Sequence, residues 1–418
     1  MKENKYKIIE QLKPYKEELT LGLIFLVAFL VRIFISGSVL GHTTDMGCFS
    51  HWSEQIFTQG LSGFYSGNII CDYPPLYIYF LWIVEFFRSM LNLMFVSPEH
   101  LILLKLPSVI FDLLTAALVY KIAKKRLSYR GAILSLMLIA FSPVFIFNSS
   151  AWGQVDSIFT FFIALTAYYI IEDKLHFATL SYVLAVLLKP QAFIFAPILI
   201  YGYIRSKDWK KVLLSLTYGL MLFVGAVLPF AIYEGPLWIF DLYFGTMGQY
   251  AFSTFNAYNI YALLGQNIAS HSDTLFLMPY KYYGYLSIVI TCIITSLAYF
   301  KKGKKDGFYF ATASFLMTMV FTFATMMHER YLFPSVLFVL LAYIYSLDKR
   351  FLYIHILQTI TFLANNIYIL SLDKVAGYDF FSPYIAIVSA LTVFTSLWYI
   401  KVYVQQYITD KEELVNLF

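Results

Sequence analysis

The sequence predicts an all-α protein that crosses a membrane many times. Hydrophobic residues make up 60% of its 418 residues and charged residues only 13%, whereas soluble domains average about 45–50% apolar and about 25% charged residues. A compact fold of this length cannot hide so much apolar surface from water, so the composition excludes a soluble enzyme and a disordered protein. The net charge of +5 does not indicate a nucleic-acid-binding protein, because the basic residues flank the apolar runs.

Apolar runs of spanning length, or close to it, follow one another along the chain. The first is not expected to be a cleavable signal, because residues 1–19 are polar and lysine-rich and the run lacks a small-residue cleavage site. The run at 178–204 is interrupted at Lys189-Pro190-Gln191, which predicts two half-helices meeting at a break that lines a cavity. The runs cover residues 21–40, 101–121, 131–148, 157–172, 178–204, 212–233, 283–300, 307–326, 331–347, 351–371 and 383–402.

Clusters of lysine and arginine set the expected orientation, since they favour the cytoplasmic side. The segment 77–96 decides whether all of them share one side. It carries Glu85 and Arg88 in its middle, which is costly in hydrocarbon, so we expect an interfacial amphipathic helix there. All the clusters then lie in the cytoplasm, with about 12 crossings and both termini inside. The clusters are Lys2/Lys5/Lys7/Lys13/Lys16, Lys121/Lys124/Lys125/Arg126/Arg130, Arg205/Lys207/Lys210/Lys211, Lys301/Lys302/Lys304/Lys305 and Lys349/Arg350.

This orientation implies one transmembrane domain over residues 1–418 whose unusual loops share the outer face. That face receives a first extracytoplasmic loop at 41–100, a long loop at 234–281 and shorter turns around 148–156 and 327–330. The inner connections are short and basic, so any chemistry is expected outside. Three cysteines show neither paired spacing nor a CxxC motif, which favours free thiols over a Cys48–Cys71 disulfide.

The first outer loop offers a candidate general base. Asp45 opens a loop of about 60 residues, which is too long for a plain connection. A general base needs a carboxylate in a partly shielded site that faces its substrate, although an acidic residue just outside a span is more often simply solvated. In the same loop, the prolines of Asp72-Tyr73-Pro74-Pro75 fix φ and set the start of the interfacial helix.

Two other segments carry more polar residues than a turn or a span requires. Trp152, Gln154 and Asp156 stand in one short turn and resemble a platform for a sugar or a lipid headgroup. Lys189 is costly within an apolar stretch unless it is paired or faces water. It is either a structural partner, for example of Asp112, or a cation for a lipid phosphate, and its place near the outer surface favours the phosphate.

His328 and Arg330 suit an anionic phosphate, which Arg binds through its planar fork. The alternative is a charged helix terminus. His328 has no second histidine one helical turn away, so no zinc motif is present, and a divalent metal finds no support in the sequence. Neither a Walker loop nor a GxGxxG motif occurs, so no nucleotide cofactor is indicated. An activated substrate must then arrive through the membrane on a lipid.

In chain order, the motifs resemble those of the polytopic C-type (GT-C) glycosyltransferases. They are an outer-loop Asp followed by an aromatic residue and a Trp, then Tyr-Pro-Pro-Leu, Trp-Gly-Gln-Val-Asp, Lys-Pro-Gln and His-Glu-Arg-Tyr. The similarity covers residues 20–335 and is strongest to the prokaryotic branch related to the second mannosyltransferase of GPI-anchor synthesis. It extends more distantly to the endoplasmic-reticulum glucosyltransferases that use dolichyl-phosphate-glucose.

The resemblance implies a GT-C fold that transfers one hexose, with mannose suggested, from a polyprenyl-phosphate donor to an acceptor hydroxyl. Transfer would occur on the extracytoplasmic face, with inversion. Asp45 matches the catalytic base, and His328 with Arg330 matches the position that meets the donor phosphate. The expected substrate-binding set is Lys189, Gln191, His328, Arg330, Trp152, Gln154, Asp156, Tyr73 and Asn259.

Two other functions remain open at this point. One is a non-enzymatic transporter or flippase of lipid-linked sugar, although no internal repeat is visible. The other keeps the fold but moves a whole glycan or extends a polymer. The expected partners are the donor lipid, a glycan, glycolipid or polymer acceptor and the bilayer of a bacterial plasma membrane, without nucleic acid. The lack of an acidic pair at the base argues against protein acceptors.

Overall fold

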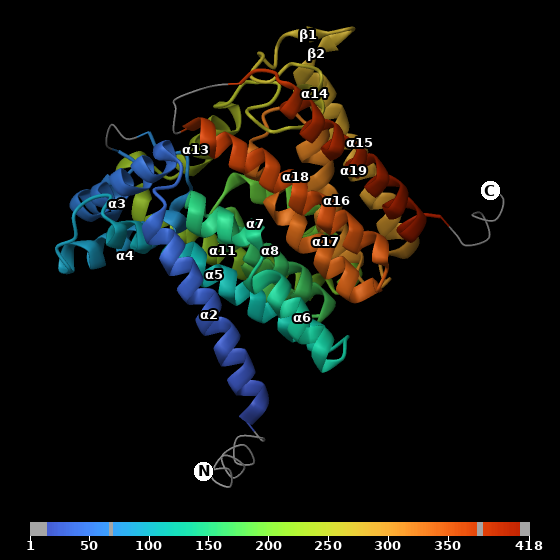
Figure 1. The fold of residues 1–418 in the computed structure, drawn as a ribbon, viewed down its shortest axis with the longest axis horizontal. Coiled ribbons are helices and arrows are strands. Elements are labelled where there is room, and N and C mark those ends of the chain that lie inside the picture. The colour runs from blue at the N-terminus through green and yellow to red at the C-terminus, as the bar shows by residue number, and fades with distance from the viewer. Residues whose placement is uncertain (1–14, 67–69, 374–378, 410–418) are drawn as a thin grey trace.

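The computed structural model describes residues 15–66, 70–373 and 379–409 and is almost entirely helical (Figure 1). The N-terminal lysines Lys2, Lys5, Lys7 and Lys13 and both chain ends lie outside these residues. The first half contains α2 (Lys16–Ser38), α3 (Thr43–Gly63), α4 (Pro75–Met90), α5 (Pro98–Lys124), α6 (Tyr129–Ala140), α7 (Pro143–Ile146), the π-helical turn η2 (Phe147–Trp152), α8 (Asp156–Ile171), α9 (Leu175–Val186), the 3₁₀ turn η3 (Pro190–Phe195) and α10 (Ala196–Ser206).

The second half begins with a long helix and continues through the predicted outer loop. It contains α11 (Trp209–Val227), η4 (Leu228–Phe230), α12 (Ala231–Glu234), α13 (Trp238–Gly248), α14 (Ile260–Leu263), β1 (Thr274–Leu275), β2 (Met278–Pro279), α15 (Tyr280–Lys302), α16 (Phe308–Phe323), η5 (Glu329–Leu332), α17 (Phe333–Ser346), α18 (Lys349–Asp373) and α19 (Pro383–Tyr407). The two strands form one antiparallel pair in which Thr274 faces Pro279.

Within the described residues, six helical segments are long and apolar enough to cross a membrane. They are Lys16–Ser38, Pro98–Lys124, Tyr129–Trp152, Trp209–Glu234, Tyr280–Lys302 and Pro383–Tyr407. Helices α8, α9 and α16 are apolar but shorter, while α18 is long but buries Gln358, Asn365 and Asn366. The protein therefore has many apolar helices, and the predicted number of about 12 crossings stays a prediction.

Helices α3 and α4 of the first predicted outer loop lie beyond the end of α2 that is farther from the N-terminus (Figure 1). Glu85 of α4 is buried, and it pairs with Arg88 at 2.6 Å and accepts a hydrogen bond from Ser53 of α3 at 3.1 Å. The two charges that made this segment a poor membrane span therefore neutralise each other between α3 and α4.

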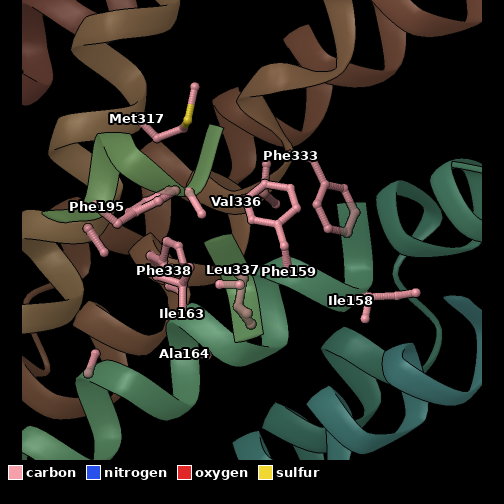
Figure 2. Close-up of a cluster of buried hydrophobic side chains, with 14 of the residues drawn as sticks. Ile158, Phe159, Ile163, Ala164, Phe195, Met317, Phe333, Val336, Leu337 and Phe338 are labelled. Atoms are coloured by element: carbon pink, nitrogen blue, oxygen red, sulfur yellow. The ribbon is translucent and has the colours of Figure 1, made fainter. Parts of the chain in front are cut away.

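The predicted break in the run 178–204 is confirmed. Helix α9 ends at Val186, the 3₁₀ turn η3 follows at Pro190–Phe195, and α10 continues from Ala196. Figure 2 shows the apolar core against which this break packs: Phe195 lies among side chains of α8, α16 and α17. The ring of Phe195 contacts that of Phe338 with 5.5 Å between their centroids. The core thus fixes the position of Lys189, which precedes η3.

Two ion pairs join the basic turn after α5 to turns that are distant in sequence. Lys125 pairs with Glu172 at 2.8 Å, and Arg126 pairs with Asp306 at 2.9 Å. These contacts bring the turns after α5, α8 and α15 to one end of the bundle, as expected if all of them face the same side of the membrane.

Candidate active site

Asp45 lies in the first turn of α3, where two side chains from a distant turn hold its carboxylate. Trp152 Nε1 donates to Asp45 Oδ2 at 2.7 Å, and Gln154 Nε2 donates to the same oxygen at 2.6 Å. No described residue donates a hydrogen bond to Oδ1, and the side chain is 17% exposed. One oxygen is therefore fixed while the other is available to a ligand.

The charge of Asp45 is stabilised by its surroundings. Burial would raise the pKa of the Asp45 carboxyl, but the charges of Arg330 and His42 and the hydrogen bonds from Trp152 and Gln154 outweigh it. The pKa is therefore lowered from its ordinary value, and Asp45 is ionised at neutral pH.

The π-helical turn η2 places Trp152 and Gln154 beside Asp45. Gly153 follows it with a left-handed φ of 91°, and the backbone N–H groups of Gly153 and Gln154 both donate to Asn148 O, at 3.1 and 2.8 Å. A backbone hydrogen bond from His42 N to Trp152 O, at 3.3 Å, joins this turn to the first predicted outer loop. The preceding residue, Gly41, has a φ of 97° and lies directly against the same carbonyl.

Gly41→Ala is expected to damage this junction. A Cβ at position 41 would overlap the backbone carbonyl of Trp152, and the positive φ would strain any L side chain. We expect a loss of about 1–3 kcal/mol in the free energy of unfolding and slower turnover, because Trp152 would be pushed from Asp45. Thermal unfolding in detergent measures the first effect. Gly225→Ala is the matched control, because its Cβ would meet nothing within 4 Å; equal behaviour of the two variants would contradict the expectation.

Lys189 does not stand free beside the site but is buried in an ion pair. Its ammonium group donates to Asp156 Oδ1 at 2.6 Å and to Gln154 Oε1 at 3.3 Å. Asn148 Nδ2 donates to the other oxygen of Asp156 at 3.1 Å. Lys189 therefore supports the Gln154 amide that holds Asp45. Asp112, the partner considered from sequence, pairs with Arg32 at 2.9 Å instead.

A cavity of about 470 Å³ opens beside Asp45. Its polar lining brings Asp45 together with His328 and Arg330, as the sequence predicted. Arg330 donates to Glu329 Oε1 at 2.7 Å. Arg330 Nε and His328 Nε2 are buried and lack a hydrogen-bond partner among the described residues. The lining residues are His42, Thr43, Thr44, Asp45, Tyr250, Phe255, Asn256, His328, Glu329, Arg330, Ile369, Leu372 and Asp373.

His328 and Arg330, two basic residues of this cavity, differ in charge. Burial lowers the pKa of His328 well below its ordinary value, and the nearby Arg330 lowers it further, so His328 is a neutral imidazole at pH 7. Burial opposes the charge of Arg330 as well, but Asp45 and Glu329 outweigh it and raise the pKa of the guanidinium. Arg330 therefore supplies the positive charge, and His328 can supply a hydrogen bond.

A second, smaller pocket lies on another side of Arg330. It is lined by Asp72, Tyr73, Lys189, Pro190, Gln191, Thr246, Tyr250, Arg330 and Tyr331. Gln191 Nε2 donates to Tyr331 OH at 2.6 Å, and the Tyr73 hydroxyl donates to Gln154 Oε1 at 3.3 Å. Arg330 and Tyr250 line both spaces, so the predicted residues Tyr73, Lys189 and Gln191 adjoin the cavity of Asp45 through Arg330.

Four predicted site residues line neither pocket: Trp152, Gln154, Asp156 and Asn259. Of these, Asn259 holds the backbone of its own loop. Its Oδ1 accepts hydrogen bonds from the backbone of Tyr261 and Ala262, at 3.0 and 3.4 Å, which caps α14. Its Nδ2 donates to Phe321 O at 3.1 Å. Asn259 therefore fixes the loop beneath the site, and its predicted contact with substrate stays a prediction.

The segment 252–258 forms a strap beside the cavity. Phe255 N donates to Met327 O at 2.8 Å, and Met326 N donates to Phe252 O at 3.1 Å. Asn365 of α18 donates to Asn256 O at 2.9 Å and accepts from Tyr258 N at 3.0 Å. The strap is thus bound both to the turn that carries His328 and to α18.

Sequence reasoning missed His42 and Asp373, which line the cavity on the side of α3. The spacing of His42 and Asp45, three residues apart, was the one available signal, because such residues are neighbours on a helix. Nothing in the sequence connected Asp373 with either.

Among the described residues, no group of three or more His, Cys, Asp and Glu side chains is arranged to hold a metal ion.

Comparison with known proteins adds one match. Residues 72–233 match the family described as dolichyl-phosphate-mannose-protein mannosyltransferase. The match covers less than half of the chain and supports a GT-C mannosyltransferase-like protein. The matched part of the chain includes Tyr73, the turn at 152–156 and the break at Lys189, while Asp45, His328 and Arg330 lie outside it. No curated protein matches the chain.

Proposed function

We propose that the protein transfers a single hexose, mannose in the first instance, from a polyprenyl-phosphate donor to an acceptor hydroxyl on the extracytoplasmic face. The observation that carries this proposal is the pairing of an ionised Asp45, whose Oδ1 is available, with a charged Arg330 across one cavity. A general base and a cation for a departing phosphate are the two groups that such a transfer needs.

The chemistry assigns a different task to each group. Asp45 Oδ1 accepts the proton of the acceptor hydroxyl as that oxygen attacks the anomeric carbon. The bond from the anomeric carbon to the phosphate oxygen breaks, and the charge that develops on the phosphate is stabilised by the Arg330 guanidinium. His328 adds a hydrogen bond without adding charge. Attack and departure on opposite faces of the sugar invert the anomeric centre.

Transfer by the purified protein tests the proposal. The protein in detergent or liposomes is supplied with synthetic polyprenyl-phosphate mannose, glucose or galactose and with glycan, glycolipid and polymer acceptors. We expect one hexose to be added with inverted configuration, in a reaction that consumes the donor. Movement of the labelled donor lipid across vesicles with no glycosidic product would instead support a flippase.

Arg330→Lys is expected to slow transfer by about 10²-fold. Lysine keeps the charge but loses the planar fork with which arginine binds two phosphate oxygens. Single-turnover rates with saturating donor measure the effect. Arg130→Lys, an exposed residue outside both pockets, is the matched control. Equal rates for Arg330→Lys and the control would remove Arg330 from the reaction.

A further inference from the structure

His42 lies between two carboxylates at the edge of the cavity. Its Nδ1 is 3.8 Å from Asp45 Oδ2, and its Nε2 is 3.5 Å from Asp373 Oδ1. The imidazole stacks on the indole of Trp152, with 5.1 Å between the ring centroids and 10° between the ring planes. His42 therefore touches both the base and the indole that donates a hydrogen bond to the base.

Asp373 anchors this histidine from a helix at the far end of the sequence. It is the last residue of α18, and its two oxygens accept hydrogen bonds from Thr43 N at 2.9 Å and Thr43 Oγ1 at 2.8 Å. In the described part of the chain, His42 is the basic side chain within 4 Å of Asp373. Asp373 thus joins the start of α3 to the end of α18 and faces the imidazole.

The other charged and titratable groups around His42 come from four further elements. Asp45 is on α3, which begins directly after His42, and Asp373 is on α18. The remaining groups are His328, Glu329 and Arg330 beside η5, Tyr250 in the loop before α14 and Lys105 of α5, which donates to Val39 O and Ser150 O. Asp45 and Asp373 are the two of these groups that form ion-pair contacts with His42.

We propose that His42, held in place by Asp373, is a positioning residue that keeps the Asp45 carboxylate ionised and oriented as the pH falls. This inference rests on the proposed function, since it concerns the base of that reaction. In the acidic range where a carboxylate takes up its proton, an imidazole is a cation. A cation 3.8 Å from Asp45 favours the ionised form, and the stack on Trp152 keeps the imidazole at that distance.

The physical basis agrees with the electrostatics of Asp45. Burial alone would raise the pKa of Asp45, and the charge of His42 is one of the two that lower it, after Arg330. Removing the charge at His42 must therefore raise the pKa of Asp45. Because the ionised form is the active one, activity would then be lost at a higher pH.

The test is the pH dependence of kcat/KM in His42→Phe, which keeps a ring to stack on Trp152 but carries no charge. We expect the acidic limb of the profile to move up by about one pH unit, so the variant's deficit grows about tenfold on the acidic side. Asp373→Asn, which leaves the imidazole without its anchor, should move the limb in the same direction by less. The double variant should match His42→Phe, because Asp373 acts through His42.

His51→Phe is the matched control, since His51 is an exposed histidine on the same helix and lies outside both pockets. An acidic limb of His42→Phe that coincides with that of the wild type would overturn the inference, as would a double variant in which the two shifts add. If His42→Phe does not fold, the single Asp373→Asn variant decides the question by the same limb. A wild-type protein that transfers no sugar would defeat the proposed function instead.

Discussion

Asp45→Asn is expected to fold normally and to transfer sugar about 10³-fold more slowly than the wild type. The asparagine oxygen can accept the hydrogen bonds that Trp152 and Gln154 donate to Oδ2, at 2.7 and 2.6 Å. Its NH₂ group then occupies the place of Oδ1, where it cannot accept a proton from the acceptor hydroxyl. Single-turnover rates, with thermal unfolding measured on the same samples, separate the loss of the base from a loss of structure.

Asp241→Asn, an exposed carboxylate on α13, is the control for this experiment. Turnover by Asp45→Asn at the wild-type rate would remove the assigned base.

The sign of the pH dependence of stability follows from the lowered pKa of Asp45. A depressed carboxyl pKa contributes stability above the pKa of the unfolded chain, and that contribution is lost as the pH falls through the folded pKa. Asp45→Asn should therefore also flatten the dependence of stability on acidic pH.

Lys189→Met is expected to destabilise the protein by about 3–5 kcal/mol. Lys189 and Asp156 are both buried, with side chains 4% and 3% exposed, and form an ion pair at 2.6 Å. Removing the ammonium group leaves the carboxylate of Asp156 buried with Asn148 as its remaining partner. The free energy of unfolding in detergent measures the loss, and turnover should fall as well because Gln154 loses a supporting hydrogen bond.

The double variant Lys189→Met/Asp156→Asn distinguishes a buried ion pair from a phosphate-binding lysine. Without either charge the desolvation penalty disappears, so the double variant should recover most of the stability lost by the single one. Lys174→Met, at an exposed position, serves as the control. If the double variant is no more stable than Lys189→Met, the ion pair is not the source of the effect.

The helical architecture could be predicted because hydrocarbon imposes simple rules on a chain. Long apolar runs gave α2, α5 and α15, and the cost of Lys189 and Pro190 inside such a run gave the break between α9 and η3. The cost of Glu85 and Arg88 likewise separated α4 from the candidate spans. These predictions depend on local composition, which a single sequence displays.

Some residues of the candidate site could be predicted from the sequence, but their contacts could not. The motifs brought Asp45, His328 and Arg330 to one cavity, yet they did not show that Lys189 is already paired with Asp156. The contact between Thr43 and Asp373 joins residues 330 positions apart and has no motif on either side. Pairings of this kind depend on how helices pack, which composition and spacing do not encode.

The bonded strap at 252–258 bears on how substrates reach Asp45. Lifting it away from the turn that carries His328 and from α18 breaks at least four hydrogen bonds, with Met326, Met327 and Asn365, at about 1 kcal/mol each. Such a penalty leaves roughly one molecule in 10³ open at any moment. A substrate whose entry required the strap to lift would find its apparent affinity weakened by the same factor. A ligand that enters sideways between the helices does not require the strap to lift, so this penalty does not weaken the binding of a ligand that is already dissolved in the lipid.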